Sequence, residues 1–594
     1  MKREEIDDKL KWDLKKIYKT EKLWEEDYKK LENIINKIYK YKGKLYSNSN
    51  TLYEALKLED EMEILFSKLS FYAYLNKDVN LKDSNAQKLC GLLDKYNVLL
   101  SEKTSYIMPE LLSKDMNTIN KFEKENEKLK EYHFMFENLF RYKDHTLSEK
   151  EERVLSMMSS SFETPSEISS VLRDNDIDFK TIKDEKGNKI KLSNNNYSLF
   201  LQSKNKRVRK DAFMTLHNTY SNYQNVLSIS YNHLVVNLYN YILLKNYKSS
   251  LEYSLFNENI PETVYTNLVD TVNKNINILH KYYKYKKEKL GYKELNLYDV
   301  YVSMTNVKSK KYTLEKAKEL ILNTFKVFGK DYTDKLKFMF DNGYIDYMPH
   351  ESKRSGAYSS TIYTQHPYVL LNYSSKYDDV STLAHELGHA MHGLYSCENN
   401  PYVYHDTSIF IAEVASTVNE LLLANYVLNN SSSKKEKMYI LDKTLELIRA
   451  TLFRQTMFAE FEKEIHSDNQ NGEVITYDLL NSKYYELNKK YFGKDVNVNK
   501  EIEIEWARIP HFYTPFYVYK YATGICASIA IVSKIINGEK GAIENYIKFL
   551  KLGSSVYPIE ALKVAGVDME DKTVIQNAIN YFDKLLNEYK ILNK

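Results

Sequence analysis

The sequence has few cysteines, and they are not spaced as metal-binding or disulfide-bonded cysteines usually are. Only three occur in 594 residues, and Cys90, Cys397 and Cys526 lie far apart in the chain. An odd number of widely separated cysteines predicts neither a disulfide framework nor a cysteine-based zinc site. We therefore expect the protein to fold in a reducing compartment.

Long apolar segments are also missing from the sequence. The N-terminal stretch MKREEIDDKLKWDLKKIY contains no apolar run of the kind found in signal peptides. The apolar run ICASIAIV at 525–532 is too short to span a bilayer and is soon followed by Lys534. These two absences predict a cytoplasmic protein that is not inserted in a membrane.

Glycine and proline are scarce, and neither sign of charge dominates. The chain has 16 glycines and 9 prolines, which favours helices over an all-β architecture. Lys and Arg total 85 and Asp and Glu total 81, and no dense basic tract is present, so we expect no nucleic-acid partner. With 43% apolar residues and this length, the chain is long enough to form more than one core.

Patterns of apolar residues divide the chain into helical and extended parts. Amphipathic helical spacing runs through the first ~160 residues, whereas residues 177–192 alternate apolar and polar around Lys186-Gly187-Asn188, as in a β-hairpin. We therefore predict an N-terminal helical domain at 1–195 that ends in this hairpin, and a second domain at 196–594. A second extended stretch at 356–375 predicts short strands just before the next motif.

The residues STLAHELGHAMHGLY at 381–395 carry the clearest chemical signal. Residues four apart lie on one face of a helix, so His385 and His389 can reach the same metal ion. Glu386 can then act as general base on a water molecule beside that ion, as in zinc hydrolases. His392 also lies near this face, but a fourth protein ligand would close a catalytic site, so we interpret it as an ordinary helix histidine.

A third ligand is needed, and Glu413 in the apolar run IFIAEVA is the best candidate. A carboxylate in such a run is costly to bury unless it is paired or bound to a metal. Glu413 could instead face solvent on an ordinary helix, but the upstream motif favours the ligand interpretation. Glu420, two turns later on the same face, is a candidate for orienting a ligand histidine, or a solvated charge. Gly388 inside the motif helix suggests close approach of another helix or of substrate.

An aromatic segment, RIPHFYTPFYVYKYATG, follows at 508–524. Thr514 and Pro515 predict the start of a helix there, on which Tyr517 would lie one turn before Tyr521 and Tyr519 would project elsewhere. A tyrosine hydroxyl or an imidazole such as that of His511 can stabilise the oxyanion formed in peptide hydrolysis. By composition alone, a tyrosine-rich helix in a tyrosine-rich chain is the simpler interpretation.

Taken in order, HELGHAMH, FIAEVASTVNE and HFYTPFYVYKYATG resemble the oligoendopeptidase F branch of the thimet oligopeptidase family. KWDLKKIY and the region DFKTIKDEKGNKIKLSNNNYSLF also look like that branch, so the resemblance covers nearly the whole chain. It implies a mostly α, elongated two-part helical protein around a deep substrate channel, with a small β-sheet beside the HExxH helix. It further implies a strand PYVLLNYS at 367–374 that binds the peptide substrate.

The resemblance also implies roles for individual residues. One Zn²⁺ per chain would be held by His385, His389 and Glu413, with Glu386 as the general base. His511 matches the family's substrate-side histidine. The family's tyrosines can be matched to this sequence only with a gap in the alignment. Tyr517 is the first candidate for stabilising the oxyanion, and Tyr519 is the second.

We therefore predict a zinc-dependent endopeptidase that hydrolyses internal bonds of short cytosolic oligopeptides. Its partners would be peptide substrates, without nucleic acid or membrane, and the sequence does not indicate an oligomeric state. A dipeptidyl carboxypeptidase of the same family is one alternative, although no motif supplies a cationic group for the substrate's C-terminal carboxylate. A catalytically silent helical peptide-binding protein is another, and a structural helical array without metal is a third. The complete set of ligands and base argues against the last two.

Overall fold

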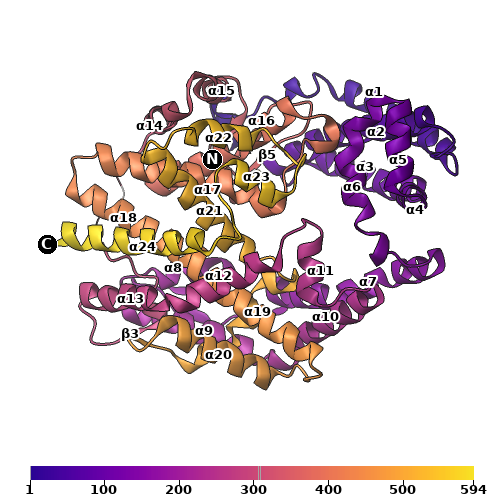
Figure 1. Cartoon of the computed structure of the whole chain (residues 1–594). Coiled ribbons are helices and arrows are strands. Elements are labelled where there is room, and N and C mark those ends of the chain that lie inside the picture. The colour runs from indigo at the N-terminus through magenta and orange to yellow at the C-terminus, as the bar shows by residue number, and fades with distance from the viewer. Residues whose placement is uncertain (1, 306, 308–309) are drawn as a thin grey trace. The chain divides into compact units, whose positions relative to one another are not determined.

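The computed structural model describes residues 2–305, 307 and 310–594, and helices hold 72% of the chain (Figure 1). The fold consists of two compact units, each assembled from three segments of the chain. Unit 1 comprises Met1–Asp144, Ser309–Tyr426 and Ile531–Gly566, and unit 2 comprises His145–Lys308, Val427–Ala530 and Val567–Lys594. The prediction of a mostly helical, two-part protein is confirmed, whereas the substrate channel stays a prediction.

Unit 1 holds the N-terminal helices and the helix that carries the HExxH motif. Its helices and strands are α1 (Glu21–Ile38), α2 (Ser49–Val79), α3 (Ser84–Thr104), α4 (Ile107–Leu112), α5 (Met116–Glu125), α6 (His133–Phe140), α14 (Leu314–Phe325), α15 (Lys330–Asp341), β4 (Ile345–Asp346), β5 (Tyr358–Ser360), β6 (Tyr368–Leu370), α16 (Tyr377–Asn399), α22 (Ala542–Leu550) and α23 (Pro558–Val564). Helix α17 (Ile409–Asn430) begins in this unit.

Unit 2 holds most of the remaining helices. Its elements are α7 (Glu149–Val171), β1 (Thr181–Lys183), β2 (Lys189–Lys191), α8 (Asn194–Leu201), α9 (Lys206–Ser221), α10 (Gln224–Leu244), α11 (Ser250–Phe256), α12 (Glu262–Lys274), α13 (Ile276–Leu290), β3 (Leu295–Asn296), α18 (Lys434–Ile448), α19 (Gln455–Gln470), α20 (Tyr477–Phe492), β7 (Val496–Asn497) and α24 (Lys572–Asn593). Helix α21 (Tyr519–Ile536) begins in this unit.

The β-hairpin expected near residue 187 is present, but neither unit ends at it. Strands β1 and β2 pair antiparallel, with Ile182 opposite Ile190, and Gly187 has the positive φ that its turn requires. The helices on either side of the hairpin belong together, because α7, which precedes the hairpin, packs against α10, which follows it, within unit 2. The compact units thus differ from the division into domains at 1–195 and 196–594, which stays a prediction.

A small sheet packs against the motif helix, as expected for the stretch 356–375. Its strand order is β4-β6-β5, with β6 parallel to β4 and antiparallel to β5, and β5 lies against α16. The stretch PYVLLNYS thus supplies the central strand, whose two edges are already paired. The expectation that this stretch binds substrate as a strand is wrong. Both β5 and β6 contact the motif helix, but only β5 of these two lies at an edge of the sheet.

The N-terminal stretch KWDLKKIY covers this sheet. The indole N–H of Trp12 donates to the backbone carbonyl of Val369 at 2.8 Å, and the Trp12 ring meets the ring of Tyr368 edge-on. The backbone N–H of Trp12 donates to Asp346, whose buried carboxylate also pairs with Lys353 at 2.7 Å. Segments more than 300 residues apart in sequence thereby fix the sheet that supports the motif helix.

Helices α16 and α17 begin at polar residues that satisfy their free backbone groups. The Asp379 carboxylate accepts from the backbone N–H of Lys376 at 2.8 Å, at the start of α16. The Ser408 hydroxyl accepts from the N–H of Phe410 at 3.1 Å, at the start of α17.

The two helices touch backbone to backbone at Gly388. A Cβ added there would lie 2.5 Å from Cα of Ser416 and 2.6 Å from the carbonyl oxygen of Ala415. The side-chain amide of Asn419 also donates to the carbonyl of Ala384 at 3.0 Å across this contact. Glycine at 388 is therefore required by the close approach of α17, one of the two reasons that the sequence suggested.

None of the helices in the described part of the chain is long and apolar enough to cross a membrane.

Replacing Gly388 with Ala should push α16 and α17 apart, because only backbone atoms surround the added methyl group. We expect a loss of about 1–3 kcal/mol in the free energy of unfolding, seen as a lower Tm. Gly91→Ala in α3 is the matched control, since its Cβ meets nothing within 4 Å. It should gain about 0.5–1 kcal/mol from helix propensity. A Tm for Gly388→Ala at or above that of the wild type would contradict the close helix contact.

Candidate metal centre

A cavity of about 460 Å³ opens within unit 1 beside the motif helix. Strand β5, helix α16 and the start of α17 form its walls, and the side chains of His385, Glu386, His389 and Glu413 line it. Imidazole and carboxylate groups, which are common metal ligands, make up much of this lining.

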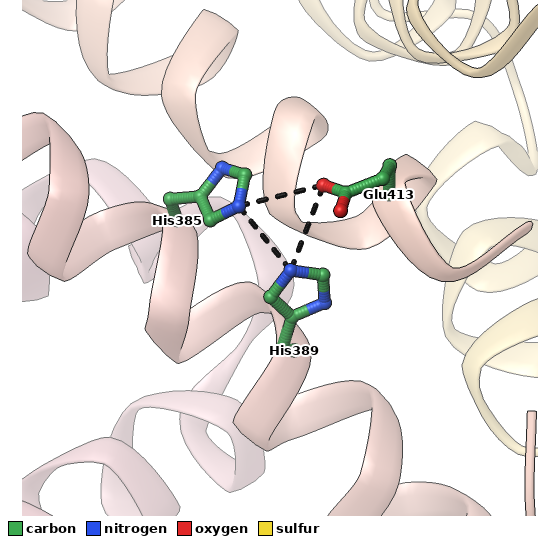
Figure 2. Close-up of side chains that lie close together, drawn as sticks. All are labelled: His385, His389 and Glu413. Carbon is green, nitrogen blue, oxygen red and sulfur yellow. Dashed lines mark hydrogen bonds and ion pairs between the residues drawn. The ribbon is translucent and has the colours of Figure 1, made fainter. Parts of the chain in front are cut away.

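Three of these side chains converge on one point (Figure 2). Nε2 of His385 lies 3.2 Å from Nε2 of His389, and Oε2 of Glu413 lies 3.4 Å and 3.6 Å from these two nitrogens. Ligand bonds of about 2.0–2.1 Å in tetrahedral directions separate ligand atoms by about 3.4 Å. Two imidazole nitrogens and one carboxylate oxygen at these separations therefore fit a zinc ion with a fourth position open.

His385, His389 and Glu413 form the only cluster of three or more His, Cys, Asp or Glu side chains in the described part of the chain that could hold a metal ion. Each side chain offers one ligand atom, and the three ligand atoms lie within 4.8 Å of one another. His392 is not a member, because it is 2% exposed and its ring packs against Phe549. The interpretation of His392 as a helix histidine rather than a ligand agrees with this packing.

Both histidines are oriented through their outer edges by groups on α17. Nδ1 of His385 lies 2.6 Å from Oε1 of Glu420, and an ionised carboxylate can only accept, so the imidazole donates this hydrogen bond. The ring of His389 bonds to the backbone of Ala412. Each contact leaves the opposite nitrogen, Nε2, to face the common point, as in metal sites where outer groups fix the histidine tautomer. Of the two roles considered for Glu420, the structure supports the orienting one.

Glu386 lines the same cavity but lies outside the ligand triangle. It is 6% exposed, and the backbone N–H of Ser359 in β5 donates a hydrogen bond to it. Burial raises its pKa to about 7; the charge of His385 lowers it, and that of Glu413 raises it. A carboxyl group that exchanges a proton near neutral pH is suited to accept and return one.

The two histidines differ in their affinity for a proton. Burial lowers the pKa of His385, but the hydrogen bond and charge of Glu420 outweigh it and raise the pKa to about 9. Burial and the positive charge of His385 lower the pKa of His389 to about 4. Without a metal ion, the pair thus carries one positive charge near neutral pH, and a metal ion bound at Nε2 would take the place of the Nε2 proton of His385.

The aromatic segment lies in unit 2, where three of its rings cluster. The ring of His511, in a short turn at Pro510–Tyr513, stacks 6.2 Å from that of Tyr517, and the Tyr517 and Tyr521 rings meet edge-on at 5.4 Å. The Tyr521 hydroxyl lies 3.5 Å from Nε2 of His511. Burial lowers the pKa of His511, so its imidazole is neutral at neutral pH.

Tyr519 points away from this cluster, as the helical spacing predicted. It is 1% exposed, and its ring packs 5.1 Å from that of Tyr265. The helix start expected at Thr514-Pro515 is wrong, because α21 begins only at Tyr519 and Phe516 takes a left-handed φ of 56°. The predicted roles of His511, Tyr517 and Tyr519 stay predictions.

Two contributions to these sites had not been expected from the sequence. The Ser359 N–H that bonds Glu386 is a backbone group, for which the sequence carries no signal. Glu462, in the stretch MFAEFEKEIH, accepts a hydrogen bond from the backbone of Phe516 at 2.7 Å. It sits in an apolar helix face, so the argument applied to Glu413 could have found it.

Comparison with known proteins gives matches over most of the chain. The family model described as "Peptidase family M3" matches residues 199–581, and that described as "Oligopeptidase F" matches residues 110–179. The chain is similar to oligopeptidase PepF of Bacillus subtilis, with 41% identity over 593 residues that cover 99% of this chain and 88% of that protein.

Solved structures agree with these sequence matches. A protein from Chlamydophila abortus superposes with a TM-score of 0.91 and 36% identity, covering 100% of this chain and 99% of that one. The oligoendopeptidase-F of Enterococcus faecium superposes with a TM-score of 0.76 and 31% identity, covering 96% and 99%.

Glu420→Gln should weaken metal binding about 10- to 100-fold, because the amide orients His385 less firmly than a carboxylate. Titration with a zinc-sensitive chelator measures this affinity. Ser381→Ala is the control, since it removes only the 3.1 Å bond to the other carboxylate oxygen of Glu420. It should change the affinity by less than about threefold. Equal affinities for Glu420→Gln and the wild type would mean that Glu420 does not support the metal.

Proposed function

The chain belongs to peptidase family M3, in its oligoendopeptidase F branch, and from this membership we propose that His385, His389 and Glu413 hold one catalytic zinc ion. The protein is a metallo-oligopeptidase that cleaves internal bonds of short peptides. The observation that carries the zinc proposal is the triangle of ligand atoms with separations of 3.2–3.6 Å at the cavity wall.

The donor set and its exposure support zinc as the metal. Two imidazoles and one carboxylate form a typical catalytic zinc set with an open fourth position. The side chains of the histidines are each 25% exposed and that of Glu413 is 38% exposed, so a ligand at this point can meet a substrate in the cavity. A zinc ion bound here supplies Lewis acidity, which polarises the scissile carbonyl and makes water more acidic.

Glu386 performs the proton transfers. Its carboxylate accepts a proton from the attacking water and then delivers that proton to the nitrogen of the leaving amine. The Ser359 N–H and the burial of Glu386 keep the carboxylate at the cavity wall. Strand β5 carries Ser359 and lies at one edge of its sheet, so it is suited to pair with an extended peptide through main-chain hydrogen bonds.

His511 and Tyr517 serve on the substrate side, with Tyr519 as the second candidate. Their role is to donate hydrogen bonds to the oxyanion that forms when the carbonyl is attacked. Support comes from the resemblance of HFYTPFYVYKYATG to the family segment and from the ring cluster of His511, Tyr517 and Tyr521. The burial of Tyr519 beside Tyr265 favours Tyr517 over it.

The protein acts in the cytoplasm on free peptides, without nucleic acid or membrane. The sequence supports this location through its few, widely separated cysteines. Cell fractionation tests it, and recovery of the protein outside the soluble cytoplasmic fraction would overturn it.

Replacing Glu386 with Gln should leave one zinc per chain but lower kcat by about 10²–10⁴, because the amide cannot accept a proton. The assay uses an internally quenched, end-blocked peptide, and elemental analysis reports the metal. A chelator should abolish wild-type cleavage and zinc should restore it.

Glu398→Gln is the matched control for this change. Glu398 lies on the same helix and pairs with Lys335 at 3.2 Å, away from the ligands. This control should keep wild-type rates. A Glu386→Gln protein that cleaves the peptide at near-normal rates would refute the assignment of the base.

A further inference from the structure

The segment between His511 and α21 contains a backbone conformation that its own sequence does not favour. Phe516 has a φ of 56°, in the left-handed region where a residue with a Cβ is strained. Glycine or asparagine usually occupies such positions, and the sequence Thr-Pro-Phe offers neither. A contact outside the segment must therefore hold this conformation, which immediately precedes Tyr517.

Glu462 of α19 makes that contact. Its Oε1 accepts the backbone N–H of Phe516 at 2.7 Å, and the residue is 0% exposed. Its Oε2 has no hydrogen-bond partner, and Glu462 forms no ion pair with any described residue. Burial raises its pKa well above the ordinary value, so the side chain is a neutral carboxylic acid that serves as an acceptor.

Neighbouring residues of α19 fix the aromatic side chains of the segment. Phe461 packs 5.2 Å from Phe512, and His466 packs 4.9 Å from Phe516. Phe461 directly precedes Glu462 and His466 follows it by one turn, so α19 anchors the segment on both sides of the hydrogen bond. With Phe516 directed into the core, Tyr517 lies beside His511, with a ring separation of 6.2 Å.

A buried carboxyl group without a charged partner is destabilising, and apolar residues would fill this helix face at less cost. We propose that Glu462 is a positioning residue: it holds Phe516 in the left-handed conformation and thereby presents Tyr517 and His511 on the substrate side. This inference rests on the proposed function of His511 and Tyr517, and Glu462 itself does not touch substrate.

The test compares Glu462→Gln with Glu462→Met in the full-length, zinc-loaded enzyme. Glutamine keeps a neutral side chain with an accepting oxygen, so kcat should stay within about threefold of the wild type. Methionine fills the space but cannot accept the Phe516 N–H. Its kcat should fall at least about tenfold while KM changes less than about threefold and zinc content stays full, because a small misplacement near reacting groups strongly affects rate.

Thr456→Val is the stability control. Thr456 lies on α19, is 0% exposed, and donates its hydroxyl to Leu452 at 2.7 Å. Its replacement should lower Tm without lowering kcat by more than about twofold. Full kcat in Glu462→Met, or an equal loss in Glu462→Gln and Glu462→Met, would overturn the inference.

A second comparison, at Phe516, tests the role of the left-handed conformation even if Glu462→Met does not fold. Phe516→Gly and Phe516→Ala both remove the ring, but only glycine takes the left-handed conformation readily. We expect a kcat about fivefold higher for Phe516→Gly than for Phe516→Ala, and equal values would overturn the proposed role of this conformation.

His511→Ala and Tyr517→Phe, assayed alongside, separate the two proposals. If these two variants lose activity while Glu462→Met keeps it, only the positioning role of Glu462 fails. If His511→Ala and Tyr517→Phe both keep full activity, the function proposed for the segment fails, and the positioning inference fails with it.

Discussion

The site depends on the close approach of α16 and α17, which Gly388 permits. The backbone of Ala415 and Ser416 occupies the space where any larger residue would place its Cβ. Because the helices meet there, Glu413 lies within 3.6 Å of both motif histidines and Glu420 bonds His385 from the next turns. One interhelical contact thereby assembles ligands, supporting groups and the cavity wall.

Much of this centre could be predicted from the sequence because its geometry follows from helical spacing. His385 and His389 lie four residues apart, and Glu413 and Glu420 repeat on one face of a second helix, so local periodicity carries the information. A carboxylate in an apolar run also needs a partner, and this requirement, together with the upstream HExxH motif, indicated Glu413 as the third ligand. The low content of glycine and proline favoured helices over an all-β architecture, and the family resemblance implied the mostly α fold.

Features that depend on distant contacts could not be predicted in the same way. The stretch PYVLLNYS has the pattern of a strand, but only pairing with β4 and β5 makes it central rather than open. Thr514-Pro515 is a good local signal for a helix start, yet the hydrogen bond from Phe516 to Glu462, 54 residues away, holds the segment in another conformation. The interleaving of segments between the two units likewise has no local signal.

Zinc K-edge X-ray absorption of the purified, zinc-loaded protein tests the proposed ligands most directly. We expect one zinc per chain with nitrogen and oxygen ligands at about 2.0–2.1 Å, the outer scattering of two imidazoles, and no sulfur. Cys397 lines the same cavity, so a thiolate ligand is the natural competitor. A sulfur shell at about 2.3 Å, or a spectrum without imidazole scattering, would contradict the assignment of His385, His389 and Glu413.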